Sequence, residues 1–389
     1  MRNKQLEYGS AQQAGMSEAR VRRIADTAEQ MVTNGVTPAQ VVVAARKGVI
    51  VVHQANGKFG SEPDAAELTR NALFPLCSIT KLFTATAILM LVEEGLMGLN
   101  RPVVDYIPEF TGPGKKAVYV HHLLTHTSGI NGEDVWKIIS RKREQGVELP
   151  ACPEGQDPDS HESLFYGYEV PLRTKPGQVM QYLGFGYQLL GEIVSRVSGV
   201  PYHRFVEERI FKPLGMNDTY FAVPDSERYR IVRRAPEAPC AEWIETEDLI
   251  QSMSAGGGAY GSAYDLAVFG QMFLLGGEYN GERLLSPISV FEMTRNQIPG
   301  VSSQYRDEVF PEAYWGYGWA INGSKRDGGD LFSSGAYSHW GAAGPFICVD
   351  PLYSTVTVHL SVELDHNRPF KNMYADHFNN TVLAAIEQL

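Results

Sequence analysis

The position of the strand-forming segments constrains the fold of this 389-residue chain more than any other feature, because they lie at its two ends. Near the N-terminus, β-branched runs flank Lys47 and Gly48 in "QVVVAARKGVIVVHQANGKF", which predicts a hairpin. Strand patterns return after about residue 287, in "YWGYGWAING", "GPFICVD" and "STVTVHLSVEL", and "DPLYS" predicts the turn of a second hairpin. Residues 74–286 follow mostly helical patterns. Within them, residues 143–167 are rich in Pro, Gly and acidic residues and predict a loop beside a binding cleft.

This arrangement predicts an α+β fold in which one domain is discontinuous in sequence. We expect one antiparallel β-sheet built from residues 1–73 and 287–389, flanked by terminal helices over residues 17–34 and 372–388. Residues 74–286 would then form an inserted, mainly helical domain. An active site is expected in the cleft between the two domains.

Net charge and cysteine spacing narrow the class of partner. The formal net charge is −11 and no dense Lys/Arg run is present, so binding to nucleic acid or to a membrane is not expected. The N-terminus lacks the apolar stretch of a signal peptide, and no run approaches the ~18 apolar residues of a membrane span. The four cysteines are far apart and never take zinc-ligand spacing. We therefore expect a cytoplasmic protein with reduced thiols that acts on a small molecule, and we interpret Cys77 as a buried apolar residue.

Ser78 and Lys81 are candidate catalytic residues because they lie three residues apart in "FPLCSITKLFTATAILMLVEEG". Side chains at this spacing on a helix are about 5 to 6 Å apart at Cβ, so the ammonium group can reach the hydroxyl. A lysine accepts the serine proton only if burial or nearby positive charge lowers its pKa, and the apolar surroundings predict a buried helix. The alternative is an ordinary helix start, with Ser78 as N-cap and Lys81 extending to solvent.

Several further segments, in this order, resemble the serine β-lactamase and penicillin-binding protein superfamily, in its class C β-lactamase-like branch with the family VIII carboxylesterases. The similarity covers roughly residues 15–365. It implies a β-lactamase/transpeptidase-like fold without a cofactor, Ser78 as the acylated nucleophile and Lys81 as the proton acceptor. The matching segments are "SITKLFTATAILMLVEEGLMGLNRPVVDYIPEF", "VHHLLTHTSGI", "KPGQVMQYLGFGYQLLGEIVSRVSG", "IFKPLGMNDT" and "GGGAYGSAYDLAVFGQMFLLGG".

The second motif of this superfamily is Y-x-N, and here it reads Tyr182-Leu183-Gly184. The resemblance implies that Tyr182 acts with the lysine as general base and protonates the leaving group. Glycine replaces the asparagine that would hold the lysine and the substrate amide, so we expect weaker recognition of amides. Without the motif order, Tyr182 would be interpreted as a packed aromatic residue.

The third motif, K-T-G or a histidine variant, is matched best by His339-Trp340-Gly341 in "SHWGAAGPFICVDP". The resemblance places it on a strand lining the other side of the cleft. Its small residues allow a backbone N–H, expected to be that of Ala342, to join the N–H of Ser78 in an oxyanion hole. Trp340 cannot supply the hydroxyl that binds a β-lactam carboxylate, whereas esterases of this branch commonly carry a similar W-G-G sequence. His339 alone could also be a strand-end histidine with a satisfied hydrogen bond.

A metal site at the histidines of "VHHLLTHTSG" is not expected. His122 and His126 would share one face of a helix next to His121, but no acidic or further histidine ligand is placed to complete a site. The segment belongs instead to the structural signature of the same superfamily.

The leading functional hypothesis is a serine hydrolase that cleaves small carboxylic esters through an acyl-serine. Acyl transfer, D-amino-acid amide or peptide hydrolysis and weak β-lactamase activity would use the same residues. A non-catalytic sensor that binds cell-wall peptides or β-lactams is a hypothesis of another class.

Overall fold

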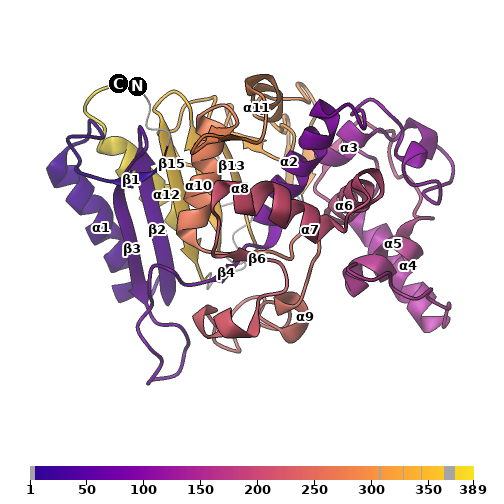
Figure 1. The fold of residues 1–389 in the computed structure, drawn as a ribbon, viewed down its shortest axis with the longest axis horizontal. Coiled ribbons are helices and arrows are strands. Elements are labelled where there is room, and N and C mark those ends of the chain that lie inside the picture. Colours follow the sequence, from indigo (N-terminus) through magenta and orange to yellow (C-terminus); the bar gives the residue numbers. More distant parts are fainter. Residues whose placement is uncertain (1–4, 306–307, 327, 343, 363–372) are drawn as a thin grey trace.

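The chain forms a β-sheet with helices against it and a larger group of helices to one side, as the ribbon in Figure 1 shows. This computed structural model describes residues 5–305, 308–326, 328–342, 344–362 and 373–389. The main sheet has the strand order β1-β3-β2-β15-β14-β13-β12. Its strands are Glu7–Tyr8 (β1), Ala39–Arg46 (β2), Val49–Gly57 (β3), Ala320–Ile321 (β12), Tyr337–Trp340 (β13), Phe346–Asp350 (β14) and Thr355–Ser361 (β15).

Most of the described helices lie between β3 and β12 in the sequence. None of the described helices has the length and apolar composition needed to cross a bilayer. The helices are Glu18–Thr33 (α1), Thr80–Glu93 (α2), Val120–Leu124 (α3), Gly132–Glu144 (α4), Pro158–Gly167 (α5), Gly184–Ser198 (α6), Tyr202–Val206 (α7), Lys212–Leu214 (α8), Glu247–Ile250 (α9), Ala263–Leu274 (α10), Pro287–Met293 (α11) and Met373–Ala384 (α12).

Smaller elements connect these helices. A 3-10 turn (η1, Cys77–Ile79) leads directly into α2. Three small sheets are formed by Phe74–Pro75 (β4), Tyr260–Gly261 (β7) and Thr219–Tyr220 (β6), by Glu308–Phe310 (β11), Ser303–Tyr305 (β10) and Met180–Gln181 (β5), and by Glu278–Tyr279 (β8) and Glu282–Arg283 (β9).

Both predicted hairpins are confirmed, and local chemistry explains each turn. Lys47 and Gly48 have φ angles of 53° and 83°, as a two-residue turn between twisted antiparallel strands requires. In the second hairpin the Asp350 carboxylate accepts hydrogen bonds from the backbone N–H groups of Leu352 and Tyr353. The turn residues thus fix the register of β2 with β3 and of β14 with β15.

The predicted sheet built from both ends of the chain is also confirmed. β2 and β15 lie side by side and antiparallel, with Val43 opposite Val358, although far apart in the sequence. One edge differs from the prediction, because β1 pairs with β3 in parallel. The division into residues 1–73 with 287–389 and residues 74–286 stays a prediction.

Successive side chains of β2 point to opposite faces of the sheet and so belong to two separate cores. Val41, Val43 and Ala45 belong to the larger core, which includes residues of α2 and α10. Val42 and Ala44 point to the opposite face, into a smaller core with α1 and α12. Because both faces are covered, every residue of β2 is buried.

Two sequence predictions of local structure are wrong in part. The segment 143–167 contains helix α5, which starts where Asp157 caps the N–H of Ser160 and Pro158 occupies the first turn. In "YWGYGWAING" only β12 is a strand, because Tyr314 and Gly318 adopt φ angles of 50° and 86° that interrupt extended structure.

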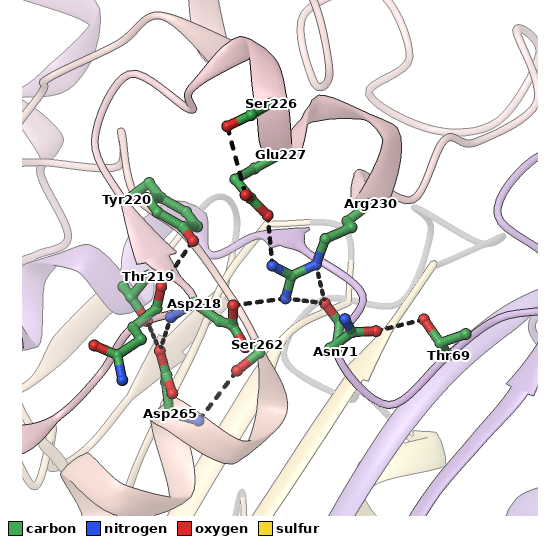
Figure 2. A network of polar contacts seen from close by, with 11 residues as sticks. Thr69, Asn71, Asp218, Thr219, Tyr220, Ser226, Glu227, Arg230, Ser262 and Asp265 are labelled. Atoms are coloured by element: carbon green, nitrogen blue, oxygen red, sulfur yellow. Dashed lines mark hydrogen bonds and ion pairs between the residues drawn. The ribbon is translucent and has the colours of Figure 1, made fainter.

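A buried polar network fixes the small sheet next to η1 (Figure 2). Arg230, which is 5% exposed, pairs with Asp218 and Glu227 and donates to the carbonyl oxygen of Asn71. The carboxylate of Asp265 accepts from the backbone N–H of Asp218 next to β6. These contacts join the segment that leads into β4 to the segment that forms β6. The chain therefore enters η1 from a firmly held strand.

Candidate active site

Ser78 lies in η1, between β4 and the buried helix α2. The backbone N–H of Leu76 donates to the Ala259 carbonyl at 2.8 Å, and the Ala259 N–H donates to Thr80 Oγ1 at 3.1 Å. Cys77 has a φ of 46°, which is unusual for a residue with a side chain. The half-buried Ser78 is thus held on a sharp turn that is anchored on both sides.

Lys81 is buried beside Ser78, on the first turn of α2. Its side-chain nitrogen lies 2.9 Å from Ser78 Oγ and donates to the carbonyl oxygen of Gly256 at 2.6 Å. Only 2% of the residue is exposed, and burial lowers the pKa of Lys81 to about 7. The Tyr182 ring lies 5.2 Å from the nitrogen. Because the amine is buried against Ser78, the alternative of a lysine extending to solvent is wrong.

Tyr182 lies opposite, between β5 and the start of α6, within a group of aromatic rings. Its ring stacks on Trp340, with centroids 6.2 Å apart and planes at 24°. Trp315 meets the same ring edge to face at 6.0 Å, and the His339 ring lies at 6.3 Å. The structure thus brings together Tyr182, Lys81 and the two residues His339 and Trp340 that the sequence predicted.

His126 accepts hydrogen bonds from the residues before and after Tyr182, a contact that the sequence did not reveal. Its carbonyl oxygen accepts the Gln181 N–H at 2.9 Å, and its Nδ1 accepts the Leu183 N–H at 3.1 Å. The imidazole also lies 4.4 Å from the Tyr182 ring between centroids. Burial, reinforced by the charge of Lys81, lowers the pKa of His126 well below its usual range, so the ring is neutral. Only the folded structure brings "LLTHTSG" next to Tyr182.

The predicted shared helical face of His122 and His126 is wrong. Helix α3 ends at Leu124, and His126 follows it with a φ of 56°. His122 instead accepts the Tyr119 N–H at its Nδ1. Within the described residues, no group of three or more His, Cys, Asp or Glu side chains is arranged to hold a metal ion.

β13 and the turn after it bring the third predicted motif against η1. A Cβ atom on Gly341 would lie 2.4 Å from the Leu76 carbonyl oxygen, so this close approach requires glycine. Ala342 packs against a small core that contains Cys77. No described residue accepts a hydrogen bond from the backbone N–H of Ser78 or of Ala342. Both N–H groups, one on the turn that carries Ser78 and one on the turn after β13, are therefore available to a ligand.

His339 is fully buried within β13. Its Nδ1 lies 2.8 Å from the Trp340 carbonyl oxygen, whereas its Nε2 has no hydrogen-bond partner among the described residues. Burial lowers the pKa of His339 to about 3, with a further contribution from the charge of Lys81. The imidazole is therefore neutral, and only one of its nitrogens is satisfied.

Two further residues near Ser78 and Tyr182 affect the chemistry of the site: Cys77 through its thiol, and Gly184 through its missing side chain. Burial raises the pKa of the Cys77 thiol to about 12, so it is not the thiolate that a nucleophilic cysteine needs. Gly184 is exposed at the first position of α6, and a Cβ atom there would meet no atom within 4 Å. The space beside Tyr182 is thus open where the Y-x-N motif would place an amide side chain.

Comparison with known proteins agrees with this geometry. Residues 24–377 match the family Beta-lactamase. An uncharacterized protein of Mycobacterium tuberculosis is 29% identical over 330 residues, which cover 75% of this chain and 78% of that protein. Esterase EstB of Burkholderia gladioli is 33% identical over 199 residues, or 49% of each chain. The crystal structure of a family VIII carboxylesterase, 22% identical, has a TM-score of 0.76 and covers 96% of this chain and 98% of its own.

The structural similarity and the sequence match support the same assignment. The solved structure shows that the fold is shared along nearly the whole chain, and the family match extends from α1 into α12. The protein is therefore a member of the Beta-lactamase family, a serine hydrolase of the β-lactamase fold.

Proposed function

We propose that the protein is a carboxylesterase that forms an acyl-enzyme on Ser78. The observation that carries this proposal is the buried Lys81 amine, 2.9 Å from Ser78 Oγ. Within the described residues, no carboxylate forms an ion pair with Lys81. A pKa of about 7 leaves a large fraction of the amine neutral at neutral pH, and only the neutral amine can accept a proton.

In the acylation step, the neutral Lys81 donates to the Gly256 carbonyl and accepts the Ser78 proton as Oγ attacks the ester carbonyl. A bond forms between Oγ and the carbonyl carbon, and the carbonyl oxygen becomes an oxyanion. The N–H groups of Ser78 and Ala342 stabilise this charge. Tyr182 protonates the alcohol oxygen as its bond to the carbonyl carbon breaks, and takes the proton back from Lys81.

In the deacylation step, water attacks the acyl carbonyl as it loses a proton to the neutral Lys81 amine. The bond to Ser78 Oγ breaks, the serine recovers its proton, and a carboxylic acid leaves. The balance of atoms is one ester and one water to one acid and one alcohol, and no further reactant is needed.

Two features of the cleft favour esters over amides and β-lactams. Gly184 offers no side-chain amide to bind the N–H and C=O groups of an amide substrate. Trp340 presents an indole, stacked on Tyr182, where a hydroxyl would bind a carboxylate. Similarity to Esterase EstB and to a family VIII carboxylesterase supports the same choice.

Parallel assays test this proposal. The purified protein and Ser78→Ala are each given p-nitrophenyl butyrate, a chromogenic cephalosporin and a D-alanyl amide. We expect kcat/KM for the ester to exceed the other two values by about a hundredfold or more, and to disappear in Ser78→Ala. Cephalosporin turnover as fast as ester turnover would refute the esterase assignment. Absence of a mass shift after incubation with a fluorophosphonate would favour a non-catalytic binding protein.

A further inference from the structure

A cavity of about 400 Å³ lies within the group of helices, away from Ser78. Its walls are formed by the segment before α5, by α5 itself, by one face of α6, by the start of α7 and by residues of the segment 253–255. Ser78, Lys81 and Tyr182 do not line it. The cavity is therefore separate from the site described above.

The lining combines an apolar body with polar groups that are not used elsewhere. Leu164, Tyr202 and Met253 supply apolar surface. The Ser160 hydroxyl has no hydrogen-bond partner among the described residues, but protein atoms enclose it, so it is not open to the cavity. The half-buried Gln188 side chain likewise makes no hydrogen bond within the described part of the chain. The Gln188 amide is therefore available to a polar group of a bound ligand.

Charge at the cavity favours a ligand that donates hydrogen bonds. Arg196 is occupied by ion pairs with Glu192 and Glu109, so it offers little to an anion. His203 is neutral, because burial lowers its pKa. Glu154 is exposed at the rim and forms no ion pair with a described residue. The charge left uncompensated is thus negative.

The wall of this cavity is connected to Lys81 through short hydrogen bonds. Tyr202 and the Ala255 carbonyl oxygen each lie 2.7 Å from Thr84 Oγ1, one turn beyond Lys81 on α2. The next carbonyl after Ala255, that of Gly256, accepts the hydrogen bond of Lys81. A molecule that contacts Ala255 can therefore shift the adjacent Gly256 carbonyl, which accepts the hydrogen bond from Lys81.

We propose that this cavity is a second ligand site, for a small molecule with an apolar body and an amino group. The apolar body lies against Leu164 and Met253, and the amino group donates to Gln188 or Glu154. Occupancy shifts the backbone at Ala255 and so changes the rate at which Ser78 is acylated. This second part rests on the proposed esterase function, whereas binding does not.

Calorimetric titration with 2-phenylethylamine tests binding, with 3-phenylpropionate as an anionic probe of similar shape. Val200→Trp, which fills the cavity, should weaken amine binding at least tenfold, while Leu352→Trp on an exposed turn should not. Glu154→Gln should weaken it severalfold, and Glu148→Gln, exposed in the same segment but outside the cavity, should not. If Val200→Trp fails to fold, the comparison of Glu154→Gln with Glu148→Gln still tests the proposal. Equal affinity for the two probes, or unchanged binding in both cavity variants, would overturn the proposal.

A kinetic measurement tests the connection to Lys81. Saturating 2-phenylethylamine should change the rate of Ser78 labelling by a fluorophosphonate at least twofold in the parent protein and not in Val200→Trp. Binding to protein already labelled at Ser78 should persist, because the two sites are separate. Loss of binding after labelling would identify the amine as a ligand of the Ser78 cleft and overturn the proposal. Binding without a change in labelling rate would overturn its second part, and failure to label at all would contradict the proposed function instead.

Discussion

The nucleophile segment, residues 77–81, and the tyrosine segment, residues 180–184, contribute to the same site but are held in different ways. The nucleophile segment is anchored to Ala259 and ends in a helix whose first twelve residues are all buried. The tyrosine segment depends on His126 for two backbone hydrogen bonds, and ends in the exposed Gly184. In the proposed mechanism the rigid segment contains both groups of the first proton transfer, Ser78 and Lys81, whereas the open end of the tyrosine segment at Gly184 borders the space that a substrate would enter. Proton transfer and substrate choice should therefore respond to different substitutions.

Removal of the buried amine should have the largest effect. Lys81→Met leaves Ser78 without a proton acceptor, so kcat/KM for p-nitrophenyl butyrate should fall by about a thousandfold or more. Lys115→Met is a matched control, because Lys115 is also buried and donates to a backbone carbonyl, at Tyr168. It should keep activity within about threefold. Equal losses in the two variants would mean that Lys81 has only a structural role.

Loss of the hydrogen bond from the tyrosine segment to the His126 side chain should have a smaller effect. His126→Ala removes the acceptor for the Leu183 N–H and places a side chain that does not favour positive φ at a φ of 56°, so kcat should fall about ten- to a hundredfold. His126→Asn should recover much of the loss, because asparagine tolerates this φ and retains an acceptor. Thermal denaturation of both variants distinguishes misplacement of Tyr182 from global instability. A change in KM alone would contradict a role for His126 in placing Tyr182.

The pH dependence of ester hydrolysis should report on Lys81. Burial lowers its pKa to about 7, so the reactive neutral amine is lost as the pH falls below that value. We expect kcat/KM to fall about tenfold per pH unit below 7 and to level off above it. Circular dichroism over the same range controls for unfolding. An acidic limb near pH 10 would indicate a solvated lysine, and one near pH 4 a carboxylate base.

Filling the open position of the tyrosine segment should have the smallest effect on ester turnover. Gly184→Asn meets no atom within 4 Å at Cβ, so the fold should accept it and ester turnover should change by less than about threefold. Amide turnover should rise several-fold, because the new side chain can bind the substrate amide. Gly335→Asn, at another exposed glycine with open space at Cβ, is the control. A rise in amide turnover in both variants would show that position 184 has no special role.

Much of the fold followed from patterns that act over a few residues. The pattern of residues 17–34 predicts a helix where α1 lies, and the turn residues Lys47 and Gly48 predict the first hairpin. Such features are local, because turn geometry and a single buried helix face specify them. The catalytic roles of Ser78, Lys81 and Tyr182, which the motif order implies, stay predictions.

The remaining features depend on contacts between distant segments, which a single sequence does not display. The sequence pattern predicts His126 on a helix, whereas its positive φ places its ring against Tyr182. The aromatic segment around Trp315 resembles a strand, but Trp315 packs beneath Tyr182 instead. The acidic and Pro-rich composition of residues 143–167 predicts a loop, whereas Asp157 caps helix α5 within this segment. Tertiary packing decided each of these cases.

Trapping of the acyl group tests the central claim most directly. The protein is mixed with p-nitrophenyl butyrate, quenched in acid within the first turnovers, digested and analysed by mass spectrometry. The account predicts a butyryl group on the peptide that contains Ser78, and none in Ser78→Ala or Lys81→Met. A butyryl group on the neighbouring Cys77, or ester turnover that leaves Ser78 unmodified at every quench time, would contradict it.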